Sequence, residues 1–407
     1  MLDLNKDEVV QVLRNYLGGE VQRVTNFEVE EQSEHTIGYL GNHLALTVDY
    51  ILNQRENRKR FFVKTHDKGD RDASFLDDTG IFQKEVDFYM VIVEEIRRSV
   101  GEPNWCPRHC FNKKRILVLD DLTEKGFAMA EGDITLEDTY VKLALKTLAR
   151  MHASSMLLER IKTKPLATVY PELFREVLYD EAKPRSPTSR WITWQVDDLL
   201  LGIDYLDKYT HQQKEYIKAN FASAIRRIYP LNKQSTRFCN VLTHGDIWKN
   251  NLMFRFEGDT PVDCRLVDFQ FFRYAPPAHD VMNFLHFATL LEDRDKNKSL
   301  YLDLYYDSLR KEFESRGMLV QDQLSKEEFL ESCEIYKELG VIQSLLSMHY
   351  ILGPVTLEFN IDNYDKYEEY LANNRKDYMK KFFEMETYTN KITETLCEFI
   401  DNYIMKS

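Results

Sequence analysis

The feature of this sequence that most constrains its fold is a change in hydrophobic periodicity near residue 121. Residues 43–52 and 60–65 are rich in Val, Phe, Leu and Thr, and the polar stretch between them indicates an antiparallel hairpin. Further windows in this part have the periods of helices or of a buried strand, at 6–18, 79–98 and 115–119. The pattern predicts a small domain of mixed structure over residues 1–121.

Beyond residue 121 the period of the sequence is mainly helical. Helices are predicted at 136–160, 195–228, 279–292, 299–316, 326–350 and 365–403, and the proline-containing stretch 160–194 is predicted to be an insertion with short helices. One segment, 239–273, interrupts this pattern with two strand-like runs at 251–256 and 264–267. We therefore predict an α+β chain whose second domain, 122–407, is large and helical.

Composition and charge narrow the partners of the chain. Its 407 residues are 43% hydrophobic and carry a net charge of −13 without a basic run, so nucleic acid and membrane surfaces are poor partners. The N-terminus lacks the apolar core of a secretory signal, and the six scattered cysteines indicate reduced thiols. These features predict a cytoplasmic protein. Any anionic ligand needs a locally positive pocket.

Three short stretches contain the residue types that phosphoryl transfer from ATP requires. They are His-Gly-Asp-Ile-Trp-Lys-Asn-Asn at 244–251, Leu-Val-Asp-Phe-Gln at 266–270 and Phe-Phe-Val-Lys at 61–64. Mg²⁺ bridges the phosphates of ATP and prefers hard oxygen ligands, which Asp268 and Asn251 offer. Asp246 lies five residues before Asn251, so both side chains can reach one phosphate from the same loop. We predict that Asp246 orients the attacking hydroxyl and accepts its proton.

Lys64 is predicted to pair with the α- and β-phosphates, and Glu85 on the following helix to hold its ammonium group. Each residue alone has a purely structural explanation, such as an Asx-capped turn for Asp246 or a solvated strand lysine for Lys64. The conjunction of the three stretches, in this order and next to predicted strands, favours a kinase.

The same stretches resemble the insect ecdysteroid-kinase-like family, within the aminoglycoside-phosphotransferase and choline-kinase-like group. The resemblance rests on 244–251, on 266–270 and on Pro-Ala-His-Asp at 277–280, and it covers nearly the whole chain. It implies a protein-kinase-like bilobal fold, with Asp246 as the catalytic base and Asn251 and Asp268 as Mg²⁺ ligands. It also implies that Asp280 holds the catalytic loop and that Leu119 belongs to a hinge contacting adenine. The implied substrate is a small-molecule alcohol on a hydrophobic body, an ecdysteroid or a xenobiotic.

The sequence departs from kinase patterns at two places. No Gly-x-Gly-x-x-Gly loop precedes the hairpin, and the backbone N–H groups of Gly41 and Asn42 are expected to bind phosphate instead. Gln270 stands where protein kinases have the glycine of Asp-Phe-Gly, which argues against a glycine-driven flip of this segment.

Several alternatives remain open from the sequence. A choline, ethanolamine or aminoglycoside kinase would bind a cationic substrate, and a pseudokinase would bind nucleotide without turnover. Cys106 and Cys110 are predicted to lie in a loop rather than in a zinc site, because no second ligand pair follows. His152 is predicted to be a buried core histidine. The aromatic residues of the helical domain, Trp191, Trp194, Tyr205 and Tyr209, fit a substrate wall or the core equally well.

Overall fold

The computed structural model describes residues 4–31, 42–66, 73–183, 186–352 and 364–406. Contacts divide the chain into two units, which we describe separately. Unit 1 comprises Met1–Gly132 and Lys249–Gln270, and unit 2 comprises Asp133–Trp248 and Phe271–Ser407. The division therefore falls after Gly132, where the sequence suggested residue 121, and it groups 249–270 with the N-terminal part. The predicted α+β class is confirmed.

Unit 1 is built around an antiparallel sheet with the order β1-β2-β3-β5-β4. Its strands are β1 (Arg23–Glu31), β2 (Asn42–Leu52), β3 (Arg55–Thr65), β4 (His109–Lys113) and β5 (Ile116–Asp120). The predicted hairpin is confirmed as β2–β3, although its link is shorter than expected. Asn53 and Gln54, both with positive φ, make the whole turn, and Leu52 pairs with Arg55. Strands β1 and β4 are not predicted from the sequence, and the loop predicted for Cys106 and Cys110 is wrong at Cys110, which is part of β4.

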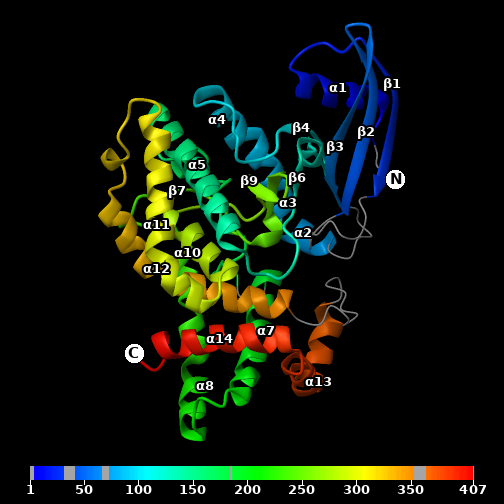
Figure 1. The fold of residues 1–407 in the computed structure, drawn as a ribbon. Coiled ribbons are helices and arrows are strands. Elements are labelled where there is room, and N and C mark those ends of the chain that lie inside the picture. The colour runs from blue at the N-terminus through cyan, green and yellow to red at the C-terminus, as the bar shows by residue number, and fades with distance from the viewer. Residues whose placement is uncertain (1–3, 32–41, 67–72, 184–185, 353–363, 407) are drawn as a thin grey trace. The chain divides into compact units, whose positions relative to one another are not determined.

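Helix α1 (Lys6–Leu17) covers one face of this sheet (Figure 1). A capping box between Asn5 and Glu8 fixes its start. The apolar side chains of α1 share a core with alternate residues of the strands, among them Val9, Leu13, Leu46, Phe61 and Val63. Because successive strand residues point to opposite faces, Lys64 lies on the face away from α1.

The other elements of unit 1 include a helical segment and a second sheet. The helical segment consists of α2 (Ala73–Thr79), α3 (Ile81–Asp87), the π-helical turn η1 (Phe88–Val93) and α4 (Glu94–Ser99). The second sheet, ordered β6-β8-β9, contains β6 (Phe127–Ala128), β8 (Leu252–Glu257) and β9 (Thr260–Leu266), with the 3₁₀ turns η2 (Leu122–Lys125) and η4 (Lys249–Asn251) nearby in sequence. The pairing of β6 with β8 explains why 249–270 belongs to unit 1.

Unit 2 is mainly helical. Its longer helices are α5 (Asp138–Lys162), α7 (Pro187–Gly202), α8 (His211–Ile225), α10 (Pro277–Ala288), α11 (Leu291–Glu314), α12 (Lys326–Ile351), α13 (Tyr364–Phe383) and α14 (Glu386–Tyr403). Its short elements are α6 (Leu166–Val169), η3 (Ile203–Tyr205), α9 (Ile228–Leu231), η5 (Val320–Asp322) and the paired strands β7 (Val241–Thr243) and β10 (Arg273–Ala275). Helix α5 lies along α11, and α10 packs on α12 (Figure 1).

Two predicted helices of this unit were wrong in their bounds. The chain forms α7 and α8 where the sequence suggested a single helix over 195–228, and α13 and α14 where it suggested one over 365–403. Ser186 caps α7 and Pro187 occupies its first turn. This start was not predicted, because the helix begins within the proline-containing stretch 160–194.

Two further findings concern the described part of the chain. All six cysteines are free thiols there, as predicted. Among the described residues, no helix combines the length and apolar character that a bilayer-spanning segment needs.

The packing of α10 on α12 depends on the absence of a side chain at Gly340. A Cβ there would lie 2.7 Å from the carbonyl oxygen of Met282 and 2.5 Å from Nδ1 of His286. We expect Gly340→Ala to lower the free energy of unfolding by about 1–3 kcal/mol, because the helices must separate to admit the methyl group. Urea denaturation measures this change. The matched control is Gly19→Ala, where a Cβ meets no atom within 4 Å, and an equal loss in both variants would contradict the explanation.

Candidate active site

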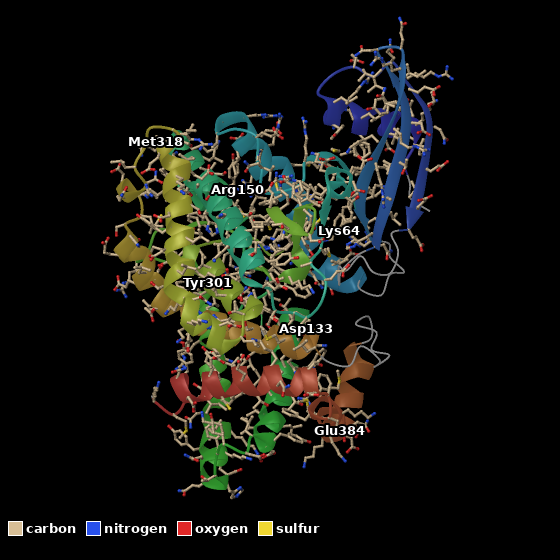
Figure 2. The ribbon with its side chains drawn as sticks, in the orientation of Figure 1. Lys64, Asp133, Arg150, Tyr301, Met318 and Glu384 are labelled. Carbon is tan, nitrogen blue, oxygen red and sulfur yellow. The ribbon has the colours of Figure 1, made fainter. Side chains whose placement is uncertain are left out.

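The predicted contact between Lys64 and Glu85 is confirmed. Lys64 lies on β3 (Figure 2), and its Nζ is 2.7 Å from Oε2 of Glu85 on α3. Both side chains are buried, with exposed fractions of 4% and 1%. A buried ammonium is tolerated only when carboxylates compensate it, so this pair joins the sheet to the helical segment of unit 1.

Asp268 completes this group from a segment 204 residues away from Lys64. Its Oδ1 lies 2.9 Å from the Lys64 Nζ, and the backbone N–H of Phe269 donates to Oε1 of Glu85 at 3.1 Å. Asp268 has a φ of +64°, in the left-handed region that residues with a side chain adopt uncommonly. Gln270 donates to the other carboxylate oxygen at 3.3 Å.

The protonation of Lys64 depends on the two carboxylates that lie beside it. Burial by itself lowers the pKa of Lys64, but the charges of Asp268 and Glu85 outweigh it and the pKa is raised, so the amine is protonated. Burial raises the pKa of Glu85, although Lys64 opposes the shift.

Asn251 and Asp268 lie at one end of the β8–β9 hairpin. The carbonyl of Asn251 accepts from the N–H of Val267 at 3.0 Å, just beyond the pairing of Leu252 with Leu266. Asn251 is buried, whereas the carboxyl group of Asp268 is 18% exposed. This backbone pairing places Asn251 next to the segment that carries Asp268. Amide and carboxylate oxygens are ligand types that Mg²⁺ accepts, and the binding of Mg²⁺ by these two residues stays a prediction. Lys64 already places a cation at the Asp268 carboxylate.

Asp246 lies in unit 2, on the loop that follows β7. It is partly exposed, whereas 241–245 and 247–249 on either side are buried. Its backbone N–H donates to Nδ1 of His244 at 3.3 Å, so this histidine braces the loop.

Asp280 at the start of α10 holds this loop by its backbone, as the resemblance implied. Its carboxylate accepts from the N–H groups of His244 at 2.6 Å and Gly245 at 2.9 Å. His152 lies 3.1 Å from the same carboxylate and 2.6 Å from the hydroxyl of Tyr305, so this histidine is buried and fully engaged, as predicted. Burial alone would raise the pKa of Asp280, but hydrogen bonds from His152 and His279 hold it well below the usual value.

The carbonyl of Gly245 accepts hydrogen bonds from two residues that were not predicted from the sequence to belong to the site. Nη1 of Arg273 donates to it at 3.2 Å and Nε2 of Gln343 on α12 at 3.1 Å. Arg273 in turn pairs with Glu176 of the 160–194 insertion at 3.0 Å. Gly245 has a φ of +80°, and a Cβ there would collide with the carbonyl of Phe271, so only glycine fits.

The remaining predicted site residues are placed as follows. Gly41 lies outside the described residues, and Asn42 is exposed at the start of β2. Leu119 is buried within β5, opposite Phe62 on one side and His109 on the other. Its contact with adenine stays a prediction, as does the binding of phosphate by Gly41 and Asn42. Lys249 is buried and donates to the carbonyl of Gly132.

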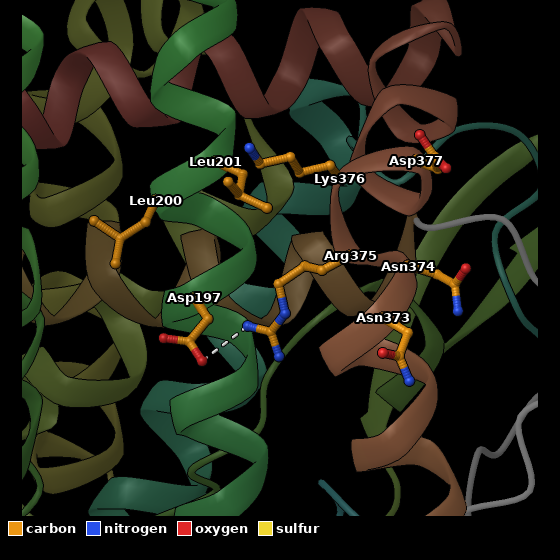
Figure 3. Close-up of a pocket in the computed structure, with 8 residues that line it drawn as sticks. All are labelled: Asp197, Leu200, Leu201, Asn373, Asn374, Arg375, Lys376 and Asp377. Atoms are coloured by element: carbon orange, nitrogen blue, oxygen red, sulfur yellow. Dashed lines mark ion pairs between the residues drawn. The ribbon is translucent and has the colours of Figure 1, made fainter.

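A cavity of about 800 Å³ in unit 2 lies between α7 and α13 (Figure 3). Arg375 projects from α13 toward α7 and pairs with Asp197 at 2.8 Å and with Asp198 at 3.4 Å. Six of the eight residues that line the cavity are polar or charged, and Leu200 and Leu201 contribute apolar surface. Trp194 and Tyr209 of the predicted aromatic wall are buried, and Tyr205 stacks on Phe383 at 4.3 Å. Their role as a substrate wall remains a prediction.

Comparison with known proteins gave a clear family match. The sequence profile of the ecdysteroid kinase-like family matches residues 37–318, more than half of the chain. A search of curated proteins gave no match.

Three solved structures show distant similarity. Plasmodium vivax ethanolamine kinase is 10% identical with a TM-score of 0.44, covering 96% of this chain and 86% of that one. The GDP complex of wild-type aminoglycoside 2'-phosphotransferase-IIIa is 12% identical with a TM-score of 0.41, covering 95% and 99%. A choline/ethanolamine kinase family protein from Mesorhizobium loti is 11% identical with a TM-score of 0.36, covering 91% and 92%.

The hydrogen bonds that the Asp280 carboxylate accepts from the backbone of His244 and Gly245 give a testable prediction. We expect Asp280→Asn to lower the free energy of unfolding by about 3 kcal/mol, because an amide turns N–H groups toward one of the loop donors and leaves it unsatisfied. Urea denaturation measures the loss. Asp204→Asn, which alters an exposed aspartate paired with Lys218, is the control and should be nearly neutral. Equal stability of the two variants would show that these hydrogen bonds contribute little to the free energy of unfolding.

Proposed function

Since the chain belongs to the ecdysteroid kinase-like family, within the small-molecule kinases, we propose that it transfers the γ-phosphoryl group of ATP to a hydroxyl of a small, largely hydrophobic molecule. An ecdysteroid or a xenobiotic alcohol is the proposed acceptor. The observation that carries the proposal is the ion-paired group of Lys64, Glu85 and Asp268. An exposed strand lysine or a strand-ending aspartate without function would not need this buried arrangement.

In the proposed mechanism Lys64 binds the α- and β-phosphates as a point charge. Glu85 keeps the ammonium group in place through its 2.7 Å contact. Asp268 and Asn251 would hold Mg²⁺, which supplies the positive charge that offsets the charge developing on the transferred phosphoryl group. The positive φ of Asp268 supports this role, because strained backbone is concentrated at functional sites.

Asp246 is the proposed catalytic base. Its carboxylate accepts a hydrogen bond from the substrate hydroxyl and aims the oxygen at the γ-phosphorus. As the new P–O bond forms and the bond to the leaving ADP breaks, the hydroxyl proton passes to Asp246. Its partial exposure beside buried neighbours supports access to a substrate.

The residues that hold the backbone next to Asp246 keep its carboxylate in position in this mechanism. Asp280 fixes the N–H groups before Asp246, and Arg273 and Gln343 fix the carbonyl of Gly245. A carboxylate attached to a backbone held from both sides loses little entropy when it orients the hydroxyl. We assign Asp280, Arg273 and Gln343 as positioning residues.

Two substitutions separate chemistry from nucleotide binding. We expect Asp246→Asn to lower kcat by about 10²–10⁴-fold with little change in the affinity for ATP, because only proton transfer and hydroxyl orientation are lost. Asp268→Asn should abolish Mg²⁺-dependent binding of ATP. Steady-state kinetics and calorimetric titration with ATP and Mg²⁺ measure both effects.

The control is Asp259→Asn, on the exposed turn of the same β8–β9 hairpin, which should behave as wild type. Full turnover by Asp246→Asn would refute the assigned base. Nucleotide binding without any turnover by the wild-type protein would favour a pseudokinase.

The acceptor is tested with a panel of alcohols. The protein is incubated with ATP, Mg²⁺ and an ecdysteroid, choline or kanamycin, and mass spectrometry detects a phosphate adduct. We expect the adduct on the ecdysteroid. Reaction of choline or kanamycin alone would replace the hydrophobic substrate with a cationic one and leave the phosphotransferase assignment intact.

A further inference from the structure

A cavity of about 320 Å³ lies within unit 1, between η1, α4 and the segment that leads into β4. We call it the η1 pocket. Its wall includes Tyr89, Met90, Val93, Glu94, Cys106 and Arg108. Cys106 and Arg108 belong to the stretch Cys106–Cys110, which has no role in the proposed phosphoryl transfer. The volume is at the lower end of the range for small-molecule sites.

The first sign of a ligand in the η1 pocket is the hydroxyl of Tyr89. The side chain is 1% exposed, and its hydroxyl has no hydrogen-bond partner among the described residues. Buried hydroxyls are nearly always paired, because an unpaired one loses its bonds to water without replacement. A bound molecule with an acceptor oxygen would supply the missing partner.

The second sign is the charge of Arg108. Within the described chain its one hydrogen bond runs from Nη1 to the carbonyl of Tyr16 at 3.0 Å, and no carboxylate pairs with it. The neighbouring Arg97 and Arg98 differ, because both pair with Glu94 at 2.7 Å. Arg108 therefore brings a half-buried positive charge, without an ion pair among the described residues, to a wall that also contains Glu94 and Glu102.

The rest of the wall is mixed. Its apolar members are Met90, Val93, Pro103 and Pro107, and it also contains the charged or polar residues Asn15, Glu94, Arg97, Arg98, Glu102 and His109. Val93 is buried, and Met90 is 47% exposed, the large solvent-facing apolar side chain of η1. Burial raises the pKa of the Cys106 thiol well above its usual value, so this residue is a neutral, weakly polar part of the wall.

We propose that the η1 pocket binds a small carboxylate with an aromatic or aliphatic body, its carboxylate on Arg108 and an acceptor oxygen on the Tyr89 hydroxyl. A guanidinium group recognises a carboxylate through paired N–H donors. Met90, Val93, Pro103 and Pro107 would contact the body of the ligand.

Occupancy of the η1 pocket is coupled to the Lys64 group through shared side chains. Tyr89 follows Glu85 by four residues on the same continuous helical segment, and η1 is a π-helical turn, a feature common at functional sites. Phe88 stacks on Phe269 at 4.2 Å, and Tyr89 meets the edge of the same ring at 5.9 Å. Trp105, next to Cys106, also contacts Phe269 at 5.7 Å. A ligand that moves these rings displaces the residue that follows Asp268.

The binding test uses three acids as probes: benzoate, indole-3-acetate and naphthalene-2-carboxylate, each compared with its primary amide. Saturable 1:1 binding to the full chain is measured by ligand-observed NMR and calorimetry. We expect at least one acid to bind, and its amide to bind at least tenfold more weakly. Arg108→Gln should weaken the acid by about tenfold and Tyr89→Phe severalfold, since each removes one polar contact.

Arg58→Gln is the matched control, because Arg58 pairs with Asp49 on the exposed sheet and does not line the η1 pocket. It should bind the acid as wild type does. Urea denaturation confirms that the three variants remain folded. Failure of all three acids to bind, or unchanged affinity in both Arg108→Gln and Tyr89→Phe, would overturn the proposed site.

The coupling, unlike the binding, rests on the proposed nucleotide site. It predicts that a saturating acid changes the dissociation constant of ATP at least severalfold, and that Arg108→Gln removes the change. An unchanged dissociation constant of ATP in the presence of the saturating acid would refute the coupling. If ATP does not bind at all while the acid does, the proposed phosphotransferase function fails and the η1 pocket stands.

Discussion

The structure of unit 1 depends on how one buried ammonium group is compensated. Lys64 is enclosed on the face of the sheet away from α1, and it meets Glu85 from the helical segment and Asp268 from the hairpin end. Removing either carboxylate would leave a buried charge poorly balanced, which is far more costly than losing an exposed ion pair. Three segments distant in sequence are therefore tied together at the atoms proposed to bind nucleotide and metal.

The loop of Asp246 in unit 2 is held on a different physical principle. No ammonium group is needed there, since a buried carboxylate, Asp280, accepts from backbone N–H groups, and Arg273 and Gln343 donate to the Gly245 carbonyl. Backbone groups are restrained and the side chain of Asp246 keeps its partial exposure. The proposed base is thereby separated from the residues that hold it.

Much of the candidate site was predictable because the residues lie close together in sequence or carry distinctive chemistry. Asp246 and Asn251 share one short stretch, and the pairing of Lys64 with Glu85 follows from the need of a buried lysine for a carboxylate. Gln343 and Glu176 were not predictable, because a glutamine on a long helix and a glutamate in an irregular insertion have no local pattern that points to a loop far away in sequence. The strands β1 and β4 were not predicted for a related reason. β1 is largely exposed over its nine residues and β4 has only five residues of mixed burial, so neither has a clear apolar period.

The sequence by itself determined the α+β class, the order of most helices and the residue types of the proposed chemistry, because periodicity and motif spacing are local properties of the chain. Only the tertiary structure decided that the β8–β9 hairpin joins the N-terminal unit, that Asp268 adopts a positive φ beside Lys64, and that a second pocket lies along η1. These features depend on pairing and burial between distant segments, whose free energies are settled by packing and not by any single stretch of sequence.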